Sequence, residues 1–308
     1  MIKREFEYPS CDRRTNIHAI EWIPEQEPKA ILQIAHGMVE YIDRYDEFAS
    51  YLAEQGFYVT GHDHLGHGKS VCSAGEYGYF PQPDGNKMVI SDIHKLRAIA
   101  SEKYPDVPYF MLGHSMGSFL LRQYLTMHSA GLSGAVIMGT GHQPHMVLQA
   151  GQLVCRIIAA VKGWKHRSKF VNSLSFGSYN KKFEPAETSK DWITSYKPIR
   201  DKYVSDPLTS FTFTVGGYYQ MFEGMKVLDK KGSVDKIRKN LPVFFVAGAD
   251  DPVGDFGKGV TKIYEKYKMA GIQDVSIKLY QDDRHEILNE TDRQQVYEDL
   301  YQWFISKI

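Results

Sequence analysis

One serine lies between an apolar run and a helical pattern, and this arrangement constrains the fold more than any other feature of the chain. The apolar residues 109–112 end in Gly-His-Ser-Met-Gly at 113–117, and apolar side chains at helical spacing follow from Phe119. A serine in such a tight turn adopts a strained backbone, which lifts its hydroxyl clear of the sheet. Side chains in place of the two flanking glycines would collide with the neighbouring strand and helix. The pattern therefore predicts that Ser115 is the nucleophile of a serine hydrolase.

The amino-terminal half of the chain alternates strand-like and helix-like segments. The periodicity of its apolar residues predicts an opening strand at residues 1–8, further strands at 15–23, 30–35, 58–61 and 134–138, and helices at 44–55 and 88–103. The strand at 30–35 is nearly all apolar, as in a sheet that is covered on both faces. The alternation predicts parallel strands that are joined by right-handed crossovers.

The alternation stops at residue 141 and resumes at about residue 240. The segment between is rich in aromatic residues and lysines, and disordered segments are poor in aromatics, so a folded insert is expected. Beyond it, the pattern predicts strands at 242–247 and 275–280 and helices at 260–269 and 293–308. We therefore predict one core, formed by residues 1–140 and 241–308, with an inserted lid at residues 141–240.

A serine hydroxyl becomes an effective nucleophile when a histidine removes its proton and a carboxylate orients that histidine. Where the serine sits on a strand-to-helix turn, the carboxylate and then the histidine follow Ser115 in the chain, each in a loop after a strand. The loop after the last predicted strand contains His285, the only histidine beyond His166. The loop after the preceding strand contains Asp250 and Asp251, which compete for the carboxylate role. We prefer Asp251, because Gly-x-x-Asp-x-Val is the usual loop spacing in such hydrolases.

Attack on an ester carbonyl creates an oxyanion that two backbone N–H groups must stabilise. The residue after the nucleophile supplies the first donor, which is the N–H of Met116. The second donor comes from the loop after an early strand. The sequence Ile-Ala-His-Gly-Met-Val at 34–39 ends such a strand, so the N–H of Met38 is the candidate. Each donor typically lowers the barrier by about 3 kcal/mol.

A second cluster contains residue types that bind metals. The stretch Gly-His-Asp-His-Leu-Gly-His-Gly-Lys-Ser at 61–70 holds three histidines and an aspartate. A catalytic zinc helix would place its ligands at i and i+4 with a nearby glutamate, whereas the glycines of this stretch indicate a tight loop. We therefore expect no metal at this position, and the effect of chelators on activity tests that expectation.

Composition excludes several classes of function. The chain has 308 residues, of which 43% are hydrophobic, and a formal net charge of zero. Because it has no basic stripe, binding to nucleic acid is not expected. The amino terminus lacks the apolar core of a signal peptide, and no stretch approaches the roughly 20 apolar residues of a membrane span. Three widely spaced cysteines, Cys11, Cys72 and Cys155, argue against a disulfide framework and predict a cytoplasmic location.

Together these segments resemble the monoacylglycerol lipase and lysophospholipase branch of the α/β-hydrolase superfamily, whose domain is also labelled serine aminopeptidase-like. The resemblance rests on blocks in the family's order: His-Gly-Met-Val-Glu-Tyr at 36–41, Arg-Tyr-Asp at 44–46, the stretches at 61–70 and 113–117, Gly-Ala-Asp-Asp at 248–251, and Arg-His-Glu-Ile-Leu-Asn-Glu at 284–290. It implies an α/β-hydrolase fold, with a mostly parallel sheet of about eight strands, flanking helices and an inserted helical lid.

The resemblance also implies what the site residues do. Ser115 would attack an ester to form an acyl-enzyme, His285 would act as general base and then general acid, and Asp251 would orient His285. Met38 and Met116 would supply the two amide donors. Water would complete the cycle without a metal or an organic cofactor. The implied substrate is a carboxylic ester of a lipid or small alcohol, such as a monoacylglycerol or a lysophospholipid.

Two positions depart from the family's pattern. Tyr41 stands where the family often has a histidine, and Ser118 stands where it often has a third glycine. Neither change removes a catalytic atom. Both are expected to alter the acyl pocket or the fit of the nucleophile turn.

The predicted lid also carries an apolar group and a basic run at 162–167. The apolar group has helical spacing and consists of Val147, Leu148, Leu153, Val154, Ile157 and Ile158. Packing inside the lid is the favoured interpretation, and transient contact with a membrane surface is the alternative. The basic run is more often a solvated face than a contact with anionic lipid.

Two other functions stay open at this point. A triad of this kind can also hydrolyse amides or peptides, and the fold does not separate the two reactions. A non-catalytic ligand-binding protein would also keep the fold, although the intact serine, aspartate and histidine argue against it. The oligomeric state is not predicted.

Overall fold

A computed structural model describes residues 1–308 and has one eight-stranded sheet in the order β1-β2-β4-β3-β5-β6-β7-β8. The strands are β1 (Ile2–Pro9), β2 (Asn16–Ile23), β3 (Ala30–Ala35), β4 (Phe57–His62), β5 (Tyr109–His114), β6 (Gly134–Met138), β7 (Val243–Gly248) and β8 (Val275–Tyr280). Strands β1 and β2 are antiparallel to their neighbours, and every pair from β4 to β8 is parallel. The predicted fold class, a mostly parallel sheet of about eight strands with flanking helices, is confirmed.

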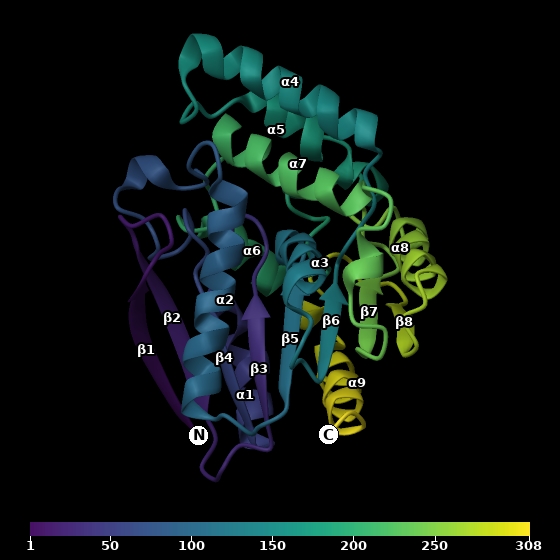
Figure 1. Ribbon diagram of the computed structural model, residues 1–308. Coiled ribbons are helices and arrows are strands. Elements are labelled where there is room, and N and C mark those ends of the chain that lie inside the picture. Colours follow the sequence, from purple (N-terminus) through teal and green to yellow (C-terminus); the bar gives the residue numbers. More distant parts are fainter.

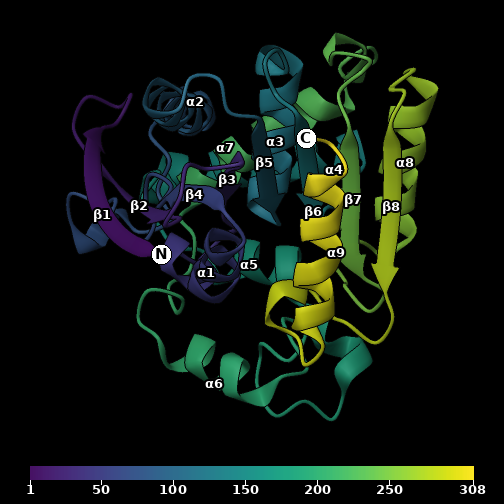
Figure 2. The same ribbon diagram turned by 90° about the horizontal axis from the view of Figure 1, so that it is seen from below.

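Helices cover both faces of the sheet (Figure 2). One layer contains α1 (Asp46–Glu54) and α9 (Arg293–Ile305), and the other contains α2 (Gly85–Lys103), α3 (Met116–His128) and α8 (Lys258–Met269). Alternate residues of β3 show the division, because Ile31 packs in the core with α2 and α3 while Leu32 packs in the core with α1 and α9. A strand buried on both faces is nearly all apolar, and the single polar residue of β3, Gln33, is hydrogen-bonded to the carbonyl oxygen of Ile93 and to the hydroxyl of Tyr109.

The segment between β6 and β7 contains helices and no strand. Its helices are α4 (His145–Lys162), α5 (Lys169–Phe176), α6 (Lys197–Ser205) and α7 (Val215–Asp229), with short 3-10 turns at Tyr179–Phe183 and Val234–Lys236. Helices α4, α5 and α7 lie beyond the carboxyl ends of β3, β5 and β6 (Figure 1). The remaining 3-10 turns are Ile42–Tyr45, Ala74–Glu76 and Ile287–Asn289. None of the helices has the length and apolar character that a membrane span requires.

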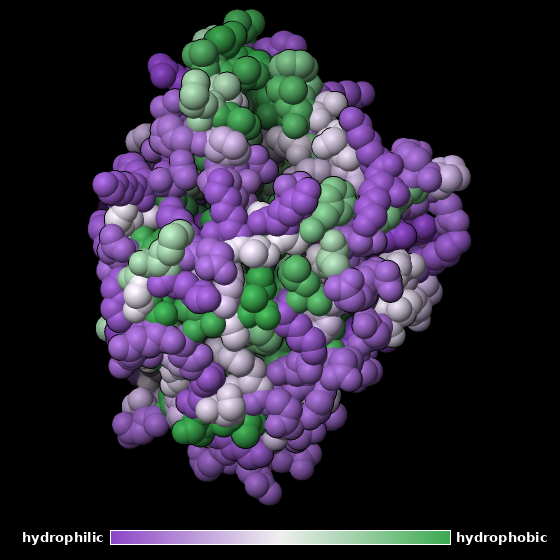
Figure 3. Space-filling model, turned by 90° about the vertical axis from the view of Figure 1, so that its right-hand side faces the viewer, coloured by the Kyte–Doolittle hydropathy of each residue, from purple (hydrophilic) through white to green (hydrophobic).

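The outer face of α4 corrects one expectation from the sequence. Packing was the favoured interpretation of its apolar residues, yet Val147, Leu153 and Ile157 are each more than half exposed, and of that group Leu148 alone is buried. Val161 of the same helix and Phe170 of α5 are also exposed. The expectation is wrong for these exposed residues, whereas Leu148 is buried and Val154 and Ile158 pack against the core, because the helix buries only the face that meets α7 and the core. Apolar residues gather on the surface at this end of the molecule (Figure 3).

Candidate active site

Ser115 occupies a strained turn between β5 and α3. Its backbone angles are φ 53° and ψ −119°, and positive φ is rare for a residue with a side chain. A Cβ on Gly117 would collide with the carbonyl group of Ala35 in β3, and a Cβ on Gly113 would collide with the carbonyl group of Gly117. The two flanking glycines are therefore required, as the sequence predicts. Ser118 donates a hydrogen bond to the carbonyl oxygen of Ser115 at 2.6 Å, so this departure from the family pattern adds a contact within the turn.

His285 and Asp251 come from the loops after β8 and β7 and meet beneath the surface. Nδ1 of His285 lies 2.9 Å from Oδ2 of Asp251, and both side chains are almost fully buried. Neither atom makes a hydrogen bond, because the N–H is not aligned with the oxygen at this distance. The other carboxylate oxygen, Oδ1, accepts a hydrogen bond from the backbone N–H of Val253 at 2.8 Å. Asp250 is not part of this contact, since its carboxylate pairs with Lys182.

The loop that carries His285 is hydrogen-bonded to the segment between β6 and β7. The backbone N–H of Glu286 donates to the carbonyl oxygen of Ile193 at 2.8 Å. The backbone N–H of His285 donates to the carbonyl oxygen of Trp192 at 3.4 Å. The ring of His285 packs near two other rings, with its centroid 5.2 Å from that of Trp192 and 4.8 Å from that of His114. Close packing against these two rings limits the rotation of the imidazole.

The loop that contains Met38 is held by buried polar groups. The backbone N–H of Gly37 donates to the carboxylate of Glu40, and the hydroxyl of Tyr203 donates to the carbonyl oxygen of Val39 at 3.0 Å. The N–H of Met38 itself donates to no other group in the chain. Met116 is the first residue of α3, where an N–H has no acceptor within the helix. Both candidate donors are therefore free to bind an oxyanion.

Glu40 belongs to a buried charge network that sequence reasoning did not identify as functional. Its carboxylate accepts from Tyr45 at 2.9 Å, lies 3.1 Å from Nδ1 of His114, and accepts from Arg44 at 2.9 Å. Arg44 also forms a bidentate pair with Glu286. Burial by itself would raise the pKa of Glu40, but His114 and Arg44 outweigh burial and lower it. The i, i+4 spacing of Glu40 and Arg44 was a local signal of an ion pair. The second partner of Arg44, Glu286, lies far away in the sequence.

The histidine-rich stretch forms a structural cluster with His36. The backbone N–H of His64 donates to Nε2 of His36 at 2.9 Å, and Nε2 of His62 lies 3.0 Å from Nδ1 of His64. Burial lowers the pKa of His62 and of His67 to about 3. Nowhere in the structure do three or more His, Cys, Asp or Glu side chains have an arrangement that could hold a metal ion. The neutral rings therefore support the backbone next to Gly37.

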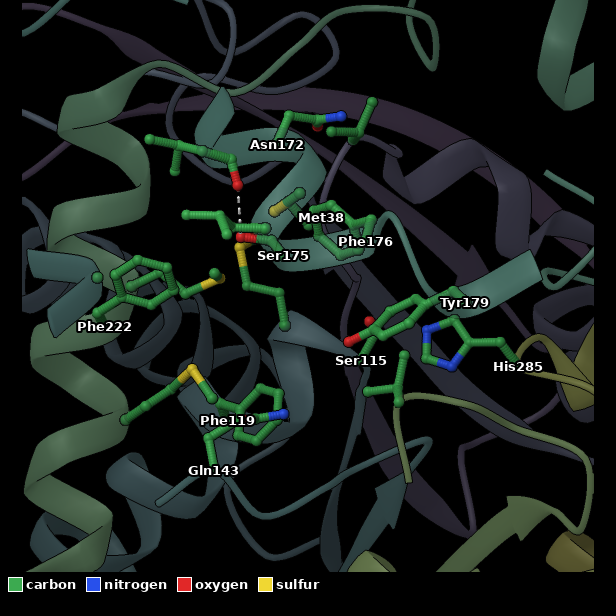
Figure 4. Close-up of a pocket in the computed structure, with 18 of the residues that line it drawn as sticks. Met38, Ser115, Phe119, Gln143, Asn172, Ser175, Phe176, Tyr179, Phe222 and His285 are labelled. Atoms are coloured by element: carbon green, nitrogen blue, oxygen red, sulfur yellow. Dashed lines mark hydrogen bonds between the residues drawn. The ribbon is translucent and has the colours of Figure 1, made fainter. Parts of the chain in front are cut away.

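A cavity of about 560 Å³ connects these parts. Ser115, Met116, Met38 and His285 all line it, and 20 of its 31 lining residues are hydrophobic. Ser115 and His285 lie together at one end and Phe222 lies at the other, with Phe119 between them (Figure 4). Asp251 lies behind His285 and does not line the cavity. The arrangement presents a hydroxyl, an imidazole and two free N–H groups to one mainly apolar space.

Comparison with known proteins agrees with this geometry. The family described as "Serine aminopeptidase, S33" matches residues 26–292. The chain belongs to this family. Human monoglyceride lipase is 29% identical over 282 residues, which cover 86% of this chain and 78% of the human protein. Monoacylglycerol lipase of Mycolicibacterium smegmatis is 23% identical, with 93% of this chain and 92% of that protein covered.

A solved structure extends the similarity over the whole chain. A highly thermostable carboxyl esterase from Bacillus coagulans, in complex with glycerol, superimposes with a TM-score of 0.92 at 30% identity, and the match covers 99% of each chain. This member of the serine aminopeptidase S33 family is thus an α/β-hydrolase of the ester-hydrolase group. The predicted resemblance to monoacylglycerol lipases is confirmed.

Proposed function

We propose that this chain hydrolyses the carboxylic ester bond of monoacyl lipids through Ser115, His285 and Asp251. The observation that carries the proposal is that Ser115, on a strained turn, and His285 face the same mainly apolar cavity. Behind the histidine, Oδ2 of Asp251 lies 2.9 Å from Nδ1 of His285. With Nδ1 beside Asp251, Nε2 of His285 is the nitrogen left to take the proton of the serine hydroxyl.

The reaction then proceeds in two halves. The Oγ atom of Ser115 attacks the ester carbonyl carbon as His285 takes its proton, and the N–H groups of Met38 and Met116 bind the oxyanion. His285 returns the proton to the alcohol, which leaves, and the acyl group stays on Ser115. Water then attacks the acyl-enzyme with His285 again as base, and the fatty acid is released. No step requires a cofactor.

The cavity supports an acyl chain as the larger part of the substrate. Its apolar end is formed by α3, α4 and α7, with Phe119, Val154 and Phe222 among the lining residues. We infer that residues 141–240 form a lid over the core, and that its movement would control entry to the cavity. The relatives described as monoglyceride lipases support a monoacyl lipid as the substrate class. The three free cysteines support a reducing, cytoplasmic location.

We also infer that the lid contacts a lipid surface during substrate uptake. Leu153, Ile157 and Val161 of α4 and Phe170 of α5 expose more than half of their surface. Val147 and Leu174 are exposed and also line the cavity, so the exposed apolar face continues into the proposed acyl site. A lipid could pass from a membrane to the cavity without crossing a polar surface.

Initial rates on p-nitrophenyl esters of increasing acyl length test the proposal, with Ser115→Ala measured beside the wild type. We expect serine-dependent rates that increase toward long acyl chains. Equal rates for the wild type and Ser115→Ala would refute the assignment. Aminoacyl amides assayed in parallel decide between ester and amide hydrolysis, and labelling of Ser115 by a fluorophosphonate decides between an enzyme and a ligand-binding protein.

A further inference from the structure

Lys190 reaches the active-site cavity from the inserted segment, between the turn at Tyr179–Phe183 and α6. Its side chain lines the cavity together with Trp192 and Tyr203. Nζ lies 6.0 Å from the ring centroid of Trp192 and 5.7 Å from that of Tyr203. Two aromatic rings thus hold the ammonium group in place through cation–π attraction.

The ammonium group of Lys190 has no anionic partner in the protein. It makes no hydrogen bond and no ion pair, whereas Lys182, Lys197 and Lys226 of the same segment each pair with a carboxylate. The nearby carboxylates are already used, because Arg44 binds both Glu40 and Glu286. Burial lowers the pKa of Lys190, and the negative charge of Glu286 opposes this effect. A partly buried cation of this kind gains free energy when an anion reaches it.

The position of Lys190 relative to the reacting groups indicates which part of a substrate it meets. In the proposed mechanism His285 protonates the departing alcohol, so the alcohol must lie beside that imidazole. The ring of Trp192 lies 5.2 Å from the ring of His285 and also holds Lys190. The apolar end of the cavity, at Phe222, is the opposite end (Figure 4). Lys190 therefore faces the alcohol portion of the ester and not the acyl chain.

We propose that Lys190 is a specificity-determining residue that binds a phosphate group on the alcohol portion of the substrate. The inference rests on the proposed function and narrows it: monoacyl glycerophosphate lipids, and not neutral monoacylglycerols, are the preferred substrate class. The phosphate would accept a charge-assisted hydrogen bond from Nζ, while the acyl chain occupies the apolar end. The glycerol unit would span the distance between Ser115 and Lys190.

The decisive experiment compares 1-decanoylglycerol with 1-decanoylglycerol 3-phosphate, which share one acyl chain and differ in the phosphate. For each enzyme the ratio of kcat/KM for the phosphate ester to kcat/KM for the neutral ester is measured. The wild type should favour the phosphate ester, and Lys190→Met should lower the ratio by about tenfold or more. Lys190→Arg keeps the charge and should retain most of the preference. Lys202→Met removes an exposed lysine of α6 and should leave the ratio unchanged.

A binding measurement separates failure of this inference from failure of the proposed function. Glycerol 3-phosphate and glycerol are titrated calorimetrically into Ser115→Ala and into the double variant with Lys190→Met. If glycerol 3-phosphate binds more tightly than glycerol and Lys190→Met abolishes the difference, the inference is supported. If in addition the wild type cleaves neither ester, the proposed function alone is overturned. An unchanged kinetic ratio in Lys190→Met, or equal binding of glycerol 3-phosphate to both proteins, overturns the role of Lys190.

Discussion

Arg44 holds the carboxylate of Glu286 in a bidentate pair, in which Nη1 and Nη2 each donate to one oxygen at 2.7 Å. Nη1 also donates to Glu40 at 2.9 Å. Glu286 directly follows His285, and Glu40 accepts the N–H that precedes Met38 in the chain. One guanidinium group therefore joins the loop of the proposed base to the loop of a proposed oxyanion donor, although 242 positions separate Arg44 from Glu286.

Removal of this guanidinium group should destabilise the protein. Arg44→Met would leave the buried carboxylates of Glu40 and Glu286 without their cation, so we expect a loss of about 3–5 kcal/mol in the free energy of unfolding. Urea denaturation measures the loss. Arg44→Lys is the matched control, because it keeps the charge but not the bidentate geometry, and it should lose less. Equal stability of Arg44→Met and the wild type would contradict the proposed joining role.

The two neighbouring aspartates provide a matched pair for the proposed site. Asp251→Asn should reduce kcat on an ester substrate by about 10⁴-fold, because the carboxylate no longer orients and stabilises the imidazolium of His285. Asp250→Asn removes an ion pair with Lys182 and should change kcat by no more than about twofold. Steady-state kinetics on both variants give the comparison. A larger loss in Asp250→Asn than in Asp251→Asn would reverse the assignment.

The strained backbone of Ser115 predicts a difference between two inactive variants. Its φ of 53° is a conformation that glycine adopts easily and alanine does not. Ser115→Gly should therefore have a free energy of unfolding about 1 kcal/mol higher than Ser115→Ala, and both should lose ester hydrolysis. Thermal denaturation of the two variants under the same conditions measures the difference. A more stable alanine variant would show that the turn relaxes when the hydroxyl is removed.

Asp283 should make the stability depend on pH. It is buried, its Oδ2 has no hydrogen-bond partner, and burial raises its pKa to about 8, with the charges of Asp292 and Glu290 adding to the effect. In the unfolded chain its pKa is about 3.9. Between these values the folded protein keeps a proton that the unfolded chain releases, so this group stabilises the fold at low pH and the contribution is lost as pH rises toward 8.

Asp283→Asn removes that titration. Relative to the wild type, the variant should gain stability as the pH is raised from about 4 to about 8. Urea denaturation at several pH values in this range tests the expectation, with the exposed Asp106→Asn as a control that should follow the wild type. A constant difference between Asp283→Asn and the wild type at every pH would show that Asp283 does not titrate there.

The exposed apolar face of α4 should bind lipid. The double variant Leu153→Ser and Ile157→Ser removes two side chains that are more than half exposed, so it should sediment with phosphatidylcholine vesicles about tenfold less well at unchanged thermal stability. Met269→Ser removes an even more exposed apolar side chain at the end of α8 and serves as the control. Equal vesicle binding by the wild type, the double variant and Met269→Ser would contradict lipid contact through α4.

Much of the fold could be predicted from sequence because the determining information is local. The apolar run of β3 and the two glycines around Ser115 depend on contacts with the nearest strands and helix. The periodicity of apolar residues and the spacing of the glycines were therefore enough to predict the strand and the turn. Element ends were the less accurate part: α2 begins at Gly85, three residues before the predicted start, and a 3-10 turn at Ile42–Tyr45 precedes α1. The order of Ser115, Asp251 and His285 along the chain was also readable, since each follows a strand.

Other features were decided only when the chain folded. The sequence by itself determined the parallel sheet, the nucleophile turn and the candidates Ser115 and His285, because periodicity, local sterics and chain order specify them, whereas the contacts of Asp250 with Lys182 and of Asp251 with His285 appear only in the fold. The tertiary structure decided that Arg44 meets Glu286, that Lys190 lacks a carboxylate partner inside the cavity, and which face of α4 stays exposed. Such pairings depend on distances between segments far apart in the chain, and a charged or apolar residue shows its role only when its neighbours and its access to water are known.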